Sequence, residues 1–173
     1  FYFQVDNPLV QICNPEFLGY HLLSGSEMTT QVVAKEEPRD RVGNVVQVDG
    51  RLHVIEYSDL PDEVAERRKP DGSLEVWAGS IAVHAMNLDF LARVADQAEA
   101  MPFHIARKKV PFADAIGKRI EPSEPNAVKF ERFIFDLLPW AENAVVVEVN
   151  PDEHFAPLKN RSEERRVGKE CAT

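Results

Sequence analysis

The sequence predicts an α/β fold, in which one β-sheet is flanked by α-helices. Runs rich in β-branched residues, which favour strands, alternate along the chain with segments whose apolar residues recur at helical spacing. An Asp-Gly pair, Asp49-Gly50, separates two such runs and is typical of a β-hairpin turn. The interleaving of strands and helices therefore indicates a layered α/β sandwich.

The N-terminal part of the sequence predicts two short strands with a helix between them. Residues 2–5 read as the first strand. Asn14 and Pro15 favour a helix with Asn14 as its N-cap and Pro15 at its first position. Gly25 is a plausible end for this helix. Residues 31–34 are the second predicted strand.

The middle of the sequence predicts a hairpin, a helix, a long strand and a second helix. The two strands of the hairpin are residues 45–48 and 52–55. Residues 59–68 contain the first helix, and residues 76–86 are apolar enough to cross the core as a strand. Asp89 is the expected cap of the second helix.

The C-terminal part of the sequence predicts two strands around a turn-rich segment and a helix. Residues 104–110 alternate as a strand does, and residues 113–125 are rich in turn residues. Asn126 is the expected cap of a helix. The apolar side of this helix would contain Val128, Phe130, Phe133, Ile134, Leu137 and Leu138. The β-branched residues 144–149 predict a buried strand.

The composition is that of a globular protein with an acidic balance. The formal net charge is −9, so the chain has no basic surplus for nucleic acid or anionic lipid. No apolar run approaches the length that crosses a bilayer. The two cysteines form neither a disulfide framework nor a metal-ligand cluster, and a reducing cytosol is the expected compartment.

The sequence suggests that neither end of the chain is a native terminus. The chain begins inside a predicted strand and without Met, which suggests that a preceding half-domain is missing. Residues 161–173 lack apolar periodicity, and residues 161–171 resemble the in-frame translation of a common sequencing adapter. We therefore expect residues 1–160 to be the native part and residues 161–173 to be a non-native tail.

Six short blocks along the chain resemble those of one enzyme family. In order, the blocks are residues 5–7, 54–58, 77–84, 108–112, 125–136 and 155–160. Their order and spacing cover nearly all of residues 1–160 and are similar to those of the eukaryotic-type UDP-N-acetylhexosamine and UDP-glucose pyrophosphorylases. The sequence thus resembles the UDP-sugar pyrophosphorylase family.

The resemblance implies a Rossmann-like nucleotidyltransferase fold with a mixed, mostly parallel sheet between helices. The family's Gly-rich loop, which holds the uridine and the triphosphate, is not in this chain. Residues 1–160 would then be the central and C-terminal part of the catalytic domain, containing its sugar-binding half. We expect this fragment to be inactive alone.

Two residues are implied in catalysis by the resemblance. Asp6 would hold Mg²⁺ beside the α-phosphate of UTP, since a carboxylate at a strand end suits this ion. Lys159 would bind phosphate near the reacting centre and offset the charge that develops there. Two plainer interpretations stay open: an Asx turn at Asp6 and an ordinary surface lysine at Lys159.

The resemblance also implies a set of substrate-binding residues. These are Asn7, Gly43, Glu56, Tyr57, Ser80, Phe133 and Phe135. Glu56 could accept hydrogen bonds from adjacent sugar hydroxyls, or be an exposed edge-strand charge. Gly43 suits a close approach of backbone to the sugar, or a plain turn. Phe133 and Phe135 lie two apart, so one helix cannot direct both to the same face, and a core position for one or both is the alternative.

Ser80 departs from the family pattern. The N-acetylhexosamine enzymes usually have Asn at this place, where it contacts the sugar near its 2-substituent. A serine is shorter but can still donate or accept one hydrogen bond. Two sugar substrates therefore stay open: N-acetylglucosamine 1-phosphate and glucose 1-phosphate.

The implied function is that of a uridylyltransferase with Mg²⁺ as cofactor. It would form a UDP-sugar and pyrophosphate from UTP and a sugar 1-phosphate. The alternative from another class is a non-catalytic module that binds a nucleotide sugar. The expected partners are UTP and the sugar 1-phosphate, with no nucleic acid and no membrane, and the expected location is the cytoplasm. The oligomeric state stays open.

Overall fold

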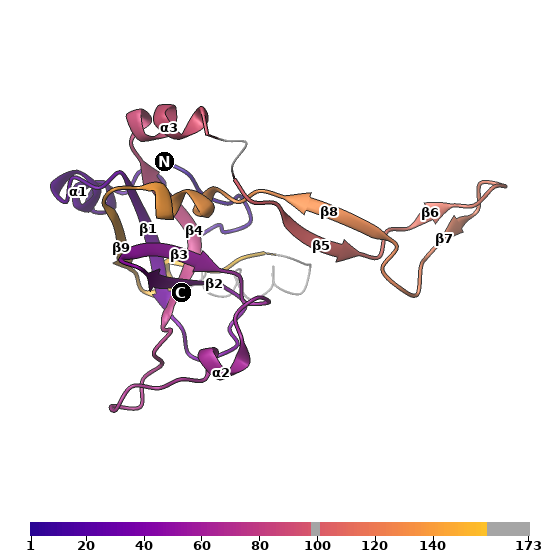
Figure 1. Cartoon of the computed structure of the whole chain (residues 1–173), viewed down its shortest axis with the longest axis horizontal. Helices are drawn as coiled ribbons and strands as arrows, with labels where there is room; N and C mark the ends of the chain where they lie inside the picture. Colours follow the sequence, from indigo (N-terminus) through magenta and orange to yellow (C-terminus); the bar gives the residue numbers. More distant parts are fainter. Residues whose placement is uncertain (98–100, 159–173) are drawn as a thin grey trace.

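The computed structural model describes residues 1–97 and 101–158, which form a body and an arm that projects from it (Figure 1). The body contains a sheet of five strands: β1 (Met28–Ala34), β2 (Gly43–Val48), β3 (Arg51–Ile55), β4 (Ala78–Met86) and β9 (Ala144–Glu148). Their order across the sheet is β3-β2-β4-β1-β9. Lys159 and the predicted tail lie outside the described residues.

The sheet is mixed, as predicted. β1 pairs in parallel with β9 and antiparallel with β4, while β2 pairs antiparallel with both β3 and β4. The expected predominance of parallel pairs is therefore wrong for these strands. β2 and β3 must be antiparallel because two residues join them. β9 is half-buried rather than buried, since β1 is its only partner strand in the described part of the sheet.

Two local predictions are confirmed in detail. Asn14 caps α1 (Pro15–Leu23): its side-chain oxygen accepts hydrogen bonds from two main-chain N–H groups of the first turn, at 2.8 and 3.0 Å. α1 ends before Gly25, whose φ of +61° suits a helix C-terminus. Asp49 and Gly50 form the hairpin turn with φ values of +49° and +78°.

Two predicted helices differ from the observed ones at their ends. The helix expected within residues 59–68 is a single turn, α2 (Asp62–Ala65). α3 (Leu88–Ala95) begins after Asn87, so Asp89 lies in its first turn instead of at its cap. An acidic side chain is also favourable in the first turn, because it faces the positive end of the helix dipole. No helix within the described ranges has the length and apolarity that a membrane span needs.

The predicted strand at residues 2–5 is wrong. Tyr2 makes an isolated antiparallel bridge with His84, with N–H to O distances of 2.8 and 2.9 Å. The chain then turns, and the N–H of Asn7 donates to the carbonyl oxygen of Gln4 at 3.3 Å. Residues 5–7 therefore belong to a turn rather than to the end of a strand.

The helix expected after Asn126 is also wrong. Residues 127–131 form a strand, β8 (Ala127–Glu131), which pairs antiparallel with β5 (His104–Lys108). A 3₁₀ helix, η2 (Ile134–Trp140), follows it. Val128 and Phe130 lie two apart and so fit one face of a strand, whereas the helical spacing holds only from residue 133 onward.

The arm consists of two successive β-ribbons. β5 and β8 form the part next to the body, and β6 (Phe112–Ala113) and β7 (Arg119–Ile120) form the tip (Figure 1). The turn-rich segment predicted at residues 113–125 thus lies at and behind the tip. Large apolar side chains of the arm are exposed: Phe103, Ile105, Val110, Phe112, Ile116, Val128 and Phe130. Isolated two-stranded ribbons are marginally stable, so the arm depends on its junction with the body.

Apolar clusters cover both faces of the sheet. On one face, Phe17 of α1 packs with Val33 of β1 and with three residues of β4. On the other face, α3 and η2 contribute Phe90 and Leu138 around Met28. Met28 and Val33 lie five residues apart in β1, and successive strand residues point to opposite faces. The body is therefore a layered α/β sandwich, as the sequence predicts.

His84 is a fully buried ionisable residue in β4. Its ring stacks on Tyr2 with 5.7 Å between centroids, and neither ring nitrogen has a hydrogen-bond partner within the described residues. Burial disfavours the charged imidazolium and lowers the pKa of His84 to about 4. An unfolded histidine titrates near a pKa of about 6.5. As the pH falls from 6.5 to 4, His84 therefore takes up a proton in the unfolded chain but not in the folded chain. This difference favours the unfolded chain and destabilises the fold.

We predict that His84→Phe stabilises the chain and reduces its sensitivity to acid. The phenyl ring keeps the stack on Tyr2 and removes two unpaired polar atoms, which should raise the free energy of unfolding at pH 7 by about 1 kcal/mol or more. Between pH 6.5 and 4 the variant should lose up to about 3 kcal/mol less than the parent chain. Urea denaturation at a series of pH values measures both effects. An unchanged pH slope would contradict this account of His84.

Candidate functional site

A cavity of about 200 Å³ opens where five segments of the body meet. The segments are the N-terminal turn, the β2–β3 hairpin with the loop before it, the start of β4, the residues around the start of η2, and the C-terminal segment. The lining residues are Gln4, Asp6, Asn7, Arg41, Val42, Gly43, Val54, Glu56, Tyr57, Ser80, Ile81, Ala82, Phe133, Phe135, Phe155 and Pro157.

The structure brings the site residues predicted from the sequence together in this cavity. Every one of them lines it except Lys159, which lies outside the described residues. They come from positions as far apart as residues 6 and 135. Their convergence on one cavity is a geometric finding, and the role of each residue stays a prediction.

Asn7 joins the two ends of the described chain. Its Nδ2 donates to the carbonyl oxygen of His154 at 2.8 Å, and its Oδ1 accepts from the N–H of Ala156 at 3.1 Å. Beside it, the N–H of Leu158 donates to the carbonyl oxygen of Asp6 at 2.7 Å. The buried amide of Asn7 therefore serves the backbone, and it holds the C-terminal segment against the cavity.

Asp6 is the candidate metal-binding residue. Its half-buried side chain lines the cavity from a turn rather than from a strand end, as the bridge at Tyr2 does not extend this far. Within the described residues, no group of three or more His, Cys, Asp or Glu could hold a metal. A single carboxylate does fit Mg²⁺, which takes most of its ligands from phosphate and water. The donor set therefore suits a metal that arrives with a phosphate substrate.

Gly43 allows a close approach of three strands at the cavity. A Cβ atom at Gly43 would lie 2.6 Å from Cγ1 of Val54, 3.8 Å from Oε1 of Glu56 and 3.8 Å from Cβ of Ser80. The first distance is too short for any larger residue without movement of Val54. Gly43 thus keeps the β2 backbone next to Glu56 and Ser80, and the predicted close approach of this backbone to the sugar stays a prediction.

A bulge in β4 shapes the wall that contains Ser80. Thr30 of β1 lies opposite His84 and Val32 lies opposite Ser80, so β4 has two additional residues over this interval. Within the bulge, Ala82 has a φ of +56°, which costs a residue with a side chain roughly 1 kcal/mol. The N–H of Ala82 donates to Oγ of Ser80 at 3.3 Å. Both residues line the cavity, so the strained backbone lies at the candidate site.

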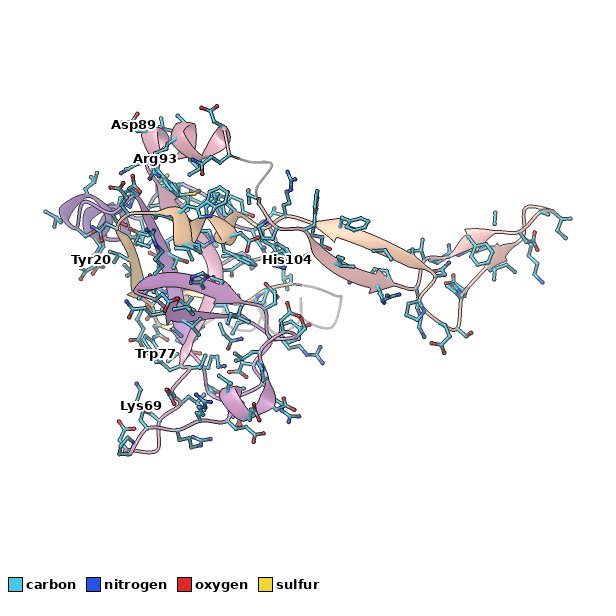
Figure 2. All side chains as sticks on the ribbon, in the orientation of Figure 1. Tyr20, Lys69, Trp77, Asp89, Arg93 and His104 are labelled. Carbon is cyan, nitrogen blue, oxygen red and sulfur yellow. The ribbon has the colours of Figure 1, made fainter. Side chains whose placement is uncertain are left out.

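Two stacked phenylalanines form an apolar wall of the cavity. The rings of Phe133 and Phe135 are 4.8 Å apart and 19° from parallel. One helix could not direct both rings to the same face, but Phe133 precedes η2 in an extended conformation, so both line the cavity. His104, at the junction of arm and body (Figure 2), lies 4.7 Å from the Phe133 ring, and its Nε2 is 2.8 Å from Oδ2 of Asp136. The contact between His104 and Asp136 connects the arm to the segment that contains both phenylalanines.

Sequence reasoning missed several lining residues, of which Arg41 is the charged one. It lies in an irregular loop between β1 and β2, where neither periodicity nor a motif indicates a site. The loop is anchored by Lys35, whose buried Nζ donates to Oδ1 of Asn44 at 2.6 Å and to the carbonyl oxygen of Pro38 at 3.1 Å. Burial lowers the pKa of Lys35. Only the folded loop shows that Arg41, which is exposed, lines the cavity.

Comparison with known proteins gives relatives for nearly the whole chain. It is 42% identical over 157 residues to the human UDP-N-acetylhexosamine pyrophosphorylase-like protein 1, covering 90% of this chain and 31% of that protein. It is 40% identical over 160 residues to the UDP-N-acetylglucosamine pyrophosphorylase of Saccharomyces cerevisiae, covering 90% of this chain and 34% of the yeast protein. The chain thus spans about a third of the length of these relatives.

A solved structure and a family profile agree with these relatives. The crystal structure of a putative UDP-N-acetylglucosamine pyrophosphorylase from Entamoeba histolytica superposes with a TM-score of 0.85 at 33% identity, covering 96% of this chain and 42% of that one. This likeness confirms the predicted nucleotidyltransferase-type α/β fold. The profile of the UTP–glucose-1-phosphate uridylyltransferase family, which is the UDP-sugar pyrophosphorylase family, matches residues 1–167. The chain therefore belongs to this family, as the sequence blocks indicated.

Proposed function

We propose that the protein containing this chain transfers the uridylyl group of UTP to N-acetylglucosamine 1-phosphate and releases pyrophosphate. The observation that carries the proposal is the single cavity in which the predicted sugar-binding residues of five segments meet. Relatives named UDP-N-acetylglucosamine pyrophosphorylase, at 35–40% identity, support the choice of reaction and sugar. The activity is that of the whole protein, since this chain spans about a third of those relatives.

The proposed role of this chain is to hold the sugar 1-phosphate. Glu56 accepts hydrogen bonds from sugar hydroxyls, and the stacked rings of Phe133 and Phe135 cover an apolar face of the substrate. Gly43 keeps the wall close enough for Glu56 and Ser80 to contact one hexose ring. A ring fixed in this way presents its phosphate oxygen in one direction, so orientation supplies much of the catalysis.

In the proposed reaction, an oxygen of the sugar phosphate attacks the α-phosphorus of UTP. The bond between this phosphorus and the oxygen that leads to the β-phosphate breaks, and pyrophosphate leaves. Asp6 would hold Mg²⁺, which when bound neutralises phosphate charge and polarises the phosphoryl oxygen. Lys159 stays the proposed phosphate-binding lysine. Asn7 and the backbone of Asp6 position the segment that precedes it.

Glucose 1-phosphate is the second candidate substrate, and Ser80 favours it. The buried hydroxyl of Ser80 accepts from the N–H of Ala82 and keeps its single O–H donor, whereas an Asn side chain has two N–H donors and an acceptor, so Ser80 offers fewer and shorter contacts to an N-acetyl group. An unmet polar group costs about 1–3 kcal/mol, enough to change a preference. The cytoplasmic location, the absence of nucleic acid and membrane partners, and the division at residue 160 stay predictions.

The test is pyrophosphate release by the full-length protein from UTP, with Mg²⁺ present. We expect release with N-acetylglucosamine 1-phosphate and less with N-acetylgalactosamine 1-phosphate. Faster release with glucose 1-phosphate than with either would assign the specificity to Ser80 and retain the uridylyltransferase. A folded protein that releases no pyrophosphate with any of the three would contradict the proposal and favour a nucleotide-sugar-binding module.

We further predict that Asp6→Asn in the full-length protein lowers kcat on the order of 100-fold. Asn has the same size and leaves the backbone bond from Leu158 intact, so the change removes charge rather than structure. The Mg²⁺ concentration needed for half-maximal rate should rise as well. Asp49→Asn, at an exposed turn position that Asn also favours, is the matched control. An unchanged rate and metal requirement in the Asp6 variant would remove Asp6 from the metal site.

A further inference from the structure

The described lining of the cavity contains one basic side chain for a substrate that is itself an anion. Among its described lining residues, Asp6 and Glu56 are acidic and Arg41 is the only basic one. The sequence as a whole has a net charge of −9. A sugar phosphate enters such a cavity at a cost unless a cation compensates for its charge. Arg41 is the cation that the described residues provide.

The loop that contains Arg41 is held in place by its own hydrogen bonds. Oδ2 of Asp40 accepts from the N–H groups of Glu36 and Glu37 at 2.9 and 3.1 Å, and the N–H of Val42 donates to the carbonyl oxygen of Asp40 at 2.8 Å. Lys35 and Asn44 anchor the two ends of the loop through their bond of 2.6 Å. The backbone of Arg41 therefore has a defined place at the cavity.

The guanidinium of Arg41 is available to a ligand. No hydrogen bond or ion pair engages it within residues 1–97 and 101–158. Arg39, two residues earlier in the same loop, differs: its Nη2 lies 3.0 Å from Asp62 and 3.5 Å from Glu66, and it does not line the cavity. The ammonium of Lys35 is likewise taken by Asn44 and Pro38. Of the three cations in this loop, Arg41 is exposed and lines the cavity, whereas Lys35 and Arg39 are engaged by other residues of the chain.

Arg41 also lies between two neighbouring cavities. A second cavity of about 380 Å³ shares Arg41, Val42, Phe155 and Pro157 with the first. An arginine has the reach and the planar set of N–H donors to bind a phosphate or carboxylate with two parallel hydrogen bonds. Its position at the boundary lets it meet an anionic group that extends beyond the space of a single hexose ring.

We propose that Arg41 is an anion-binding residue of this cavity and contacts a negatively charged group of the sugar substrate. The proposal rests on the proposed function for the identity of that substrate. Two groups have the required chemistry: the 1-phosphate itself, and a carboxylate on the sugar ring such as that of a uronic acid. The first makes Arg41 a general affinity residue. The second makes it a residue that selects acidic sugars.

The test is calorimetric binding to the full-length protein and its Arg41→Gln, Arg41→Lys and Arg39→Gln variants. The two ligands are N-acetylglucosamine 1-phosphate, which is charged at its phosphate alone, and glucuronic acid 1-phosphate, which has a carboxylate in addition. Arg41→Gln should raise the Kd about tenfold or more, and Arg41→Lys should restore part of the affinity as a point charge. Arg39→Gln should leave the Kd within about twofold, because its ion pairs are exposed and weak.

The pattern across the two ligands identifies the anion. If Arg41→Gln weakens the binding of both sugar 1-phosphates, Arg41 binds the 1-phosphate. If it weakens the binding of glucuronic acid 1-phosphate alone, Arg41 binds the carboxylate of the sugar ring. Unchanged binding of both ligands by Arg41→Gln, an equal loss in Arg39→Gln, or no binding by the parent protein overturns the proposal.

Binding and turnover keep this proposal separate from the proposed reaction. A protein that binds N-acetylglucosamine 1-phosphate through Arg41 but releases no pyrophosphate from UTP supports Arg41 and refutes the uridylyltransferase. Pyrophosphate release from UTP whose KM and kcat are unchanged by Arg41→Gln supports the uridylyltransferase and refutes the role of Arg41.

Discussion

The candidate site depends on the amide of Asn7. Two of its hydrogen bonds, to His154 and to Ala156, span 147 and 149 positions of the sequence and hold the N-terminal turn against the C-terminal segment. Because the amide is buried, losing the carbonyl of His154 would leave Nδ2 of Asn7 unpaired at a cost of about 1–3 kcal/mol. Asp6 enters the cavity from one side of this contact, and Phe155 with Pro157 lines it from the other. Without Asn7, the contact between these two walls of the cavity would depend on the backbone hydrogen bond from Leu158 to Asp6.

The sheet supplies the opposite wall through irregularities rather than through regular pairing. β2 and β4 pair at only two positions, Gly43 with Ser80 and Asn44 with Gly79, and β4 then bulges at Ala82. The stacked pair Phe133 and Phe135 lines the same cavity as Ser80 and Ala82. The site therefore requires two departures from a regular sheet: the absence of a side chain at Gly43 and a left-handed backbone conformation at Ala82.

The features that the sequence predicted correctly are those set by a few adjacent residues. The cap at Asn14 and the Asp49-Gly50 turn have one low-energy conformation each, so local reasoning suffices. The strand β8 was missed because its apolar residues run into those of η2, and only pairing with β5 decides between strand and helix. Arg41 was missed because it lies in a loop, where a side chain acquires a direction only through the fold. The resemblance located half of the lining residues, but it did not show that Asn7 acts on the backbone.

The central claim is that the cavity between Glu56 and the two phenylalanines holds the sugar. A crystal structure of the full-length protein with its UDP-sugar tests this claim most directly. We expect sugar hydroxyls within hydrogen-bonding distance of the Glu56 carboxylate, the ring or its 2-substituent against Phe133 and Phe135, and the Gly43 backbone beside the sugar. A sugar bound in another part of the protein, with this cavity filled by solvent alone, would contradict it.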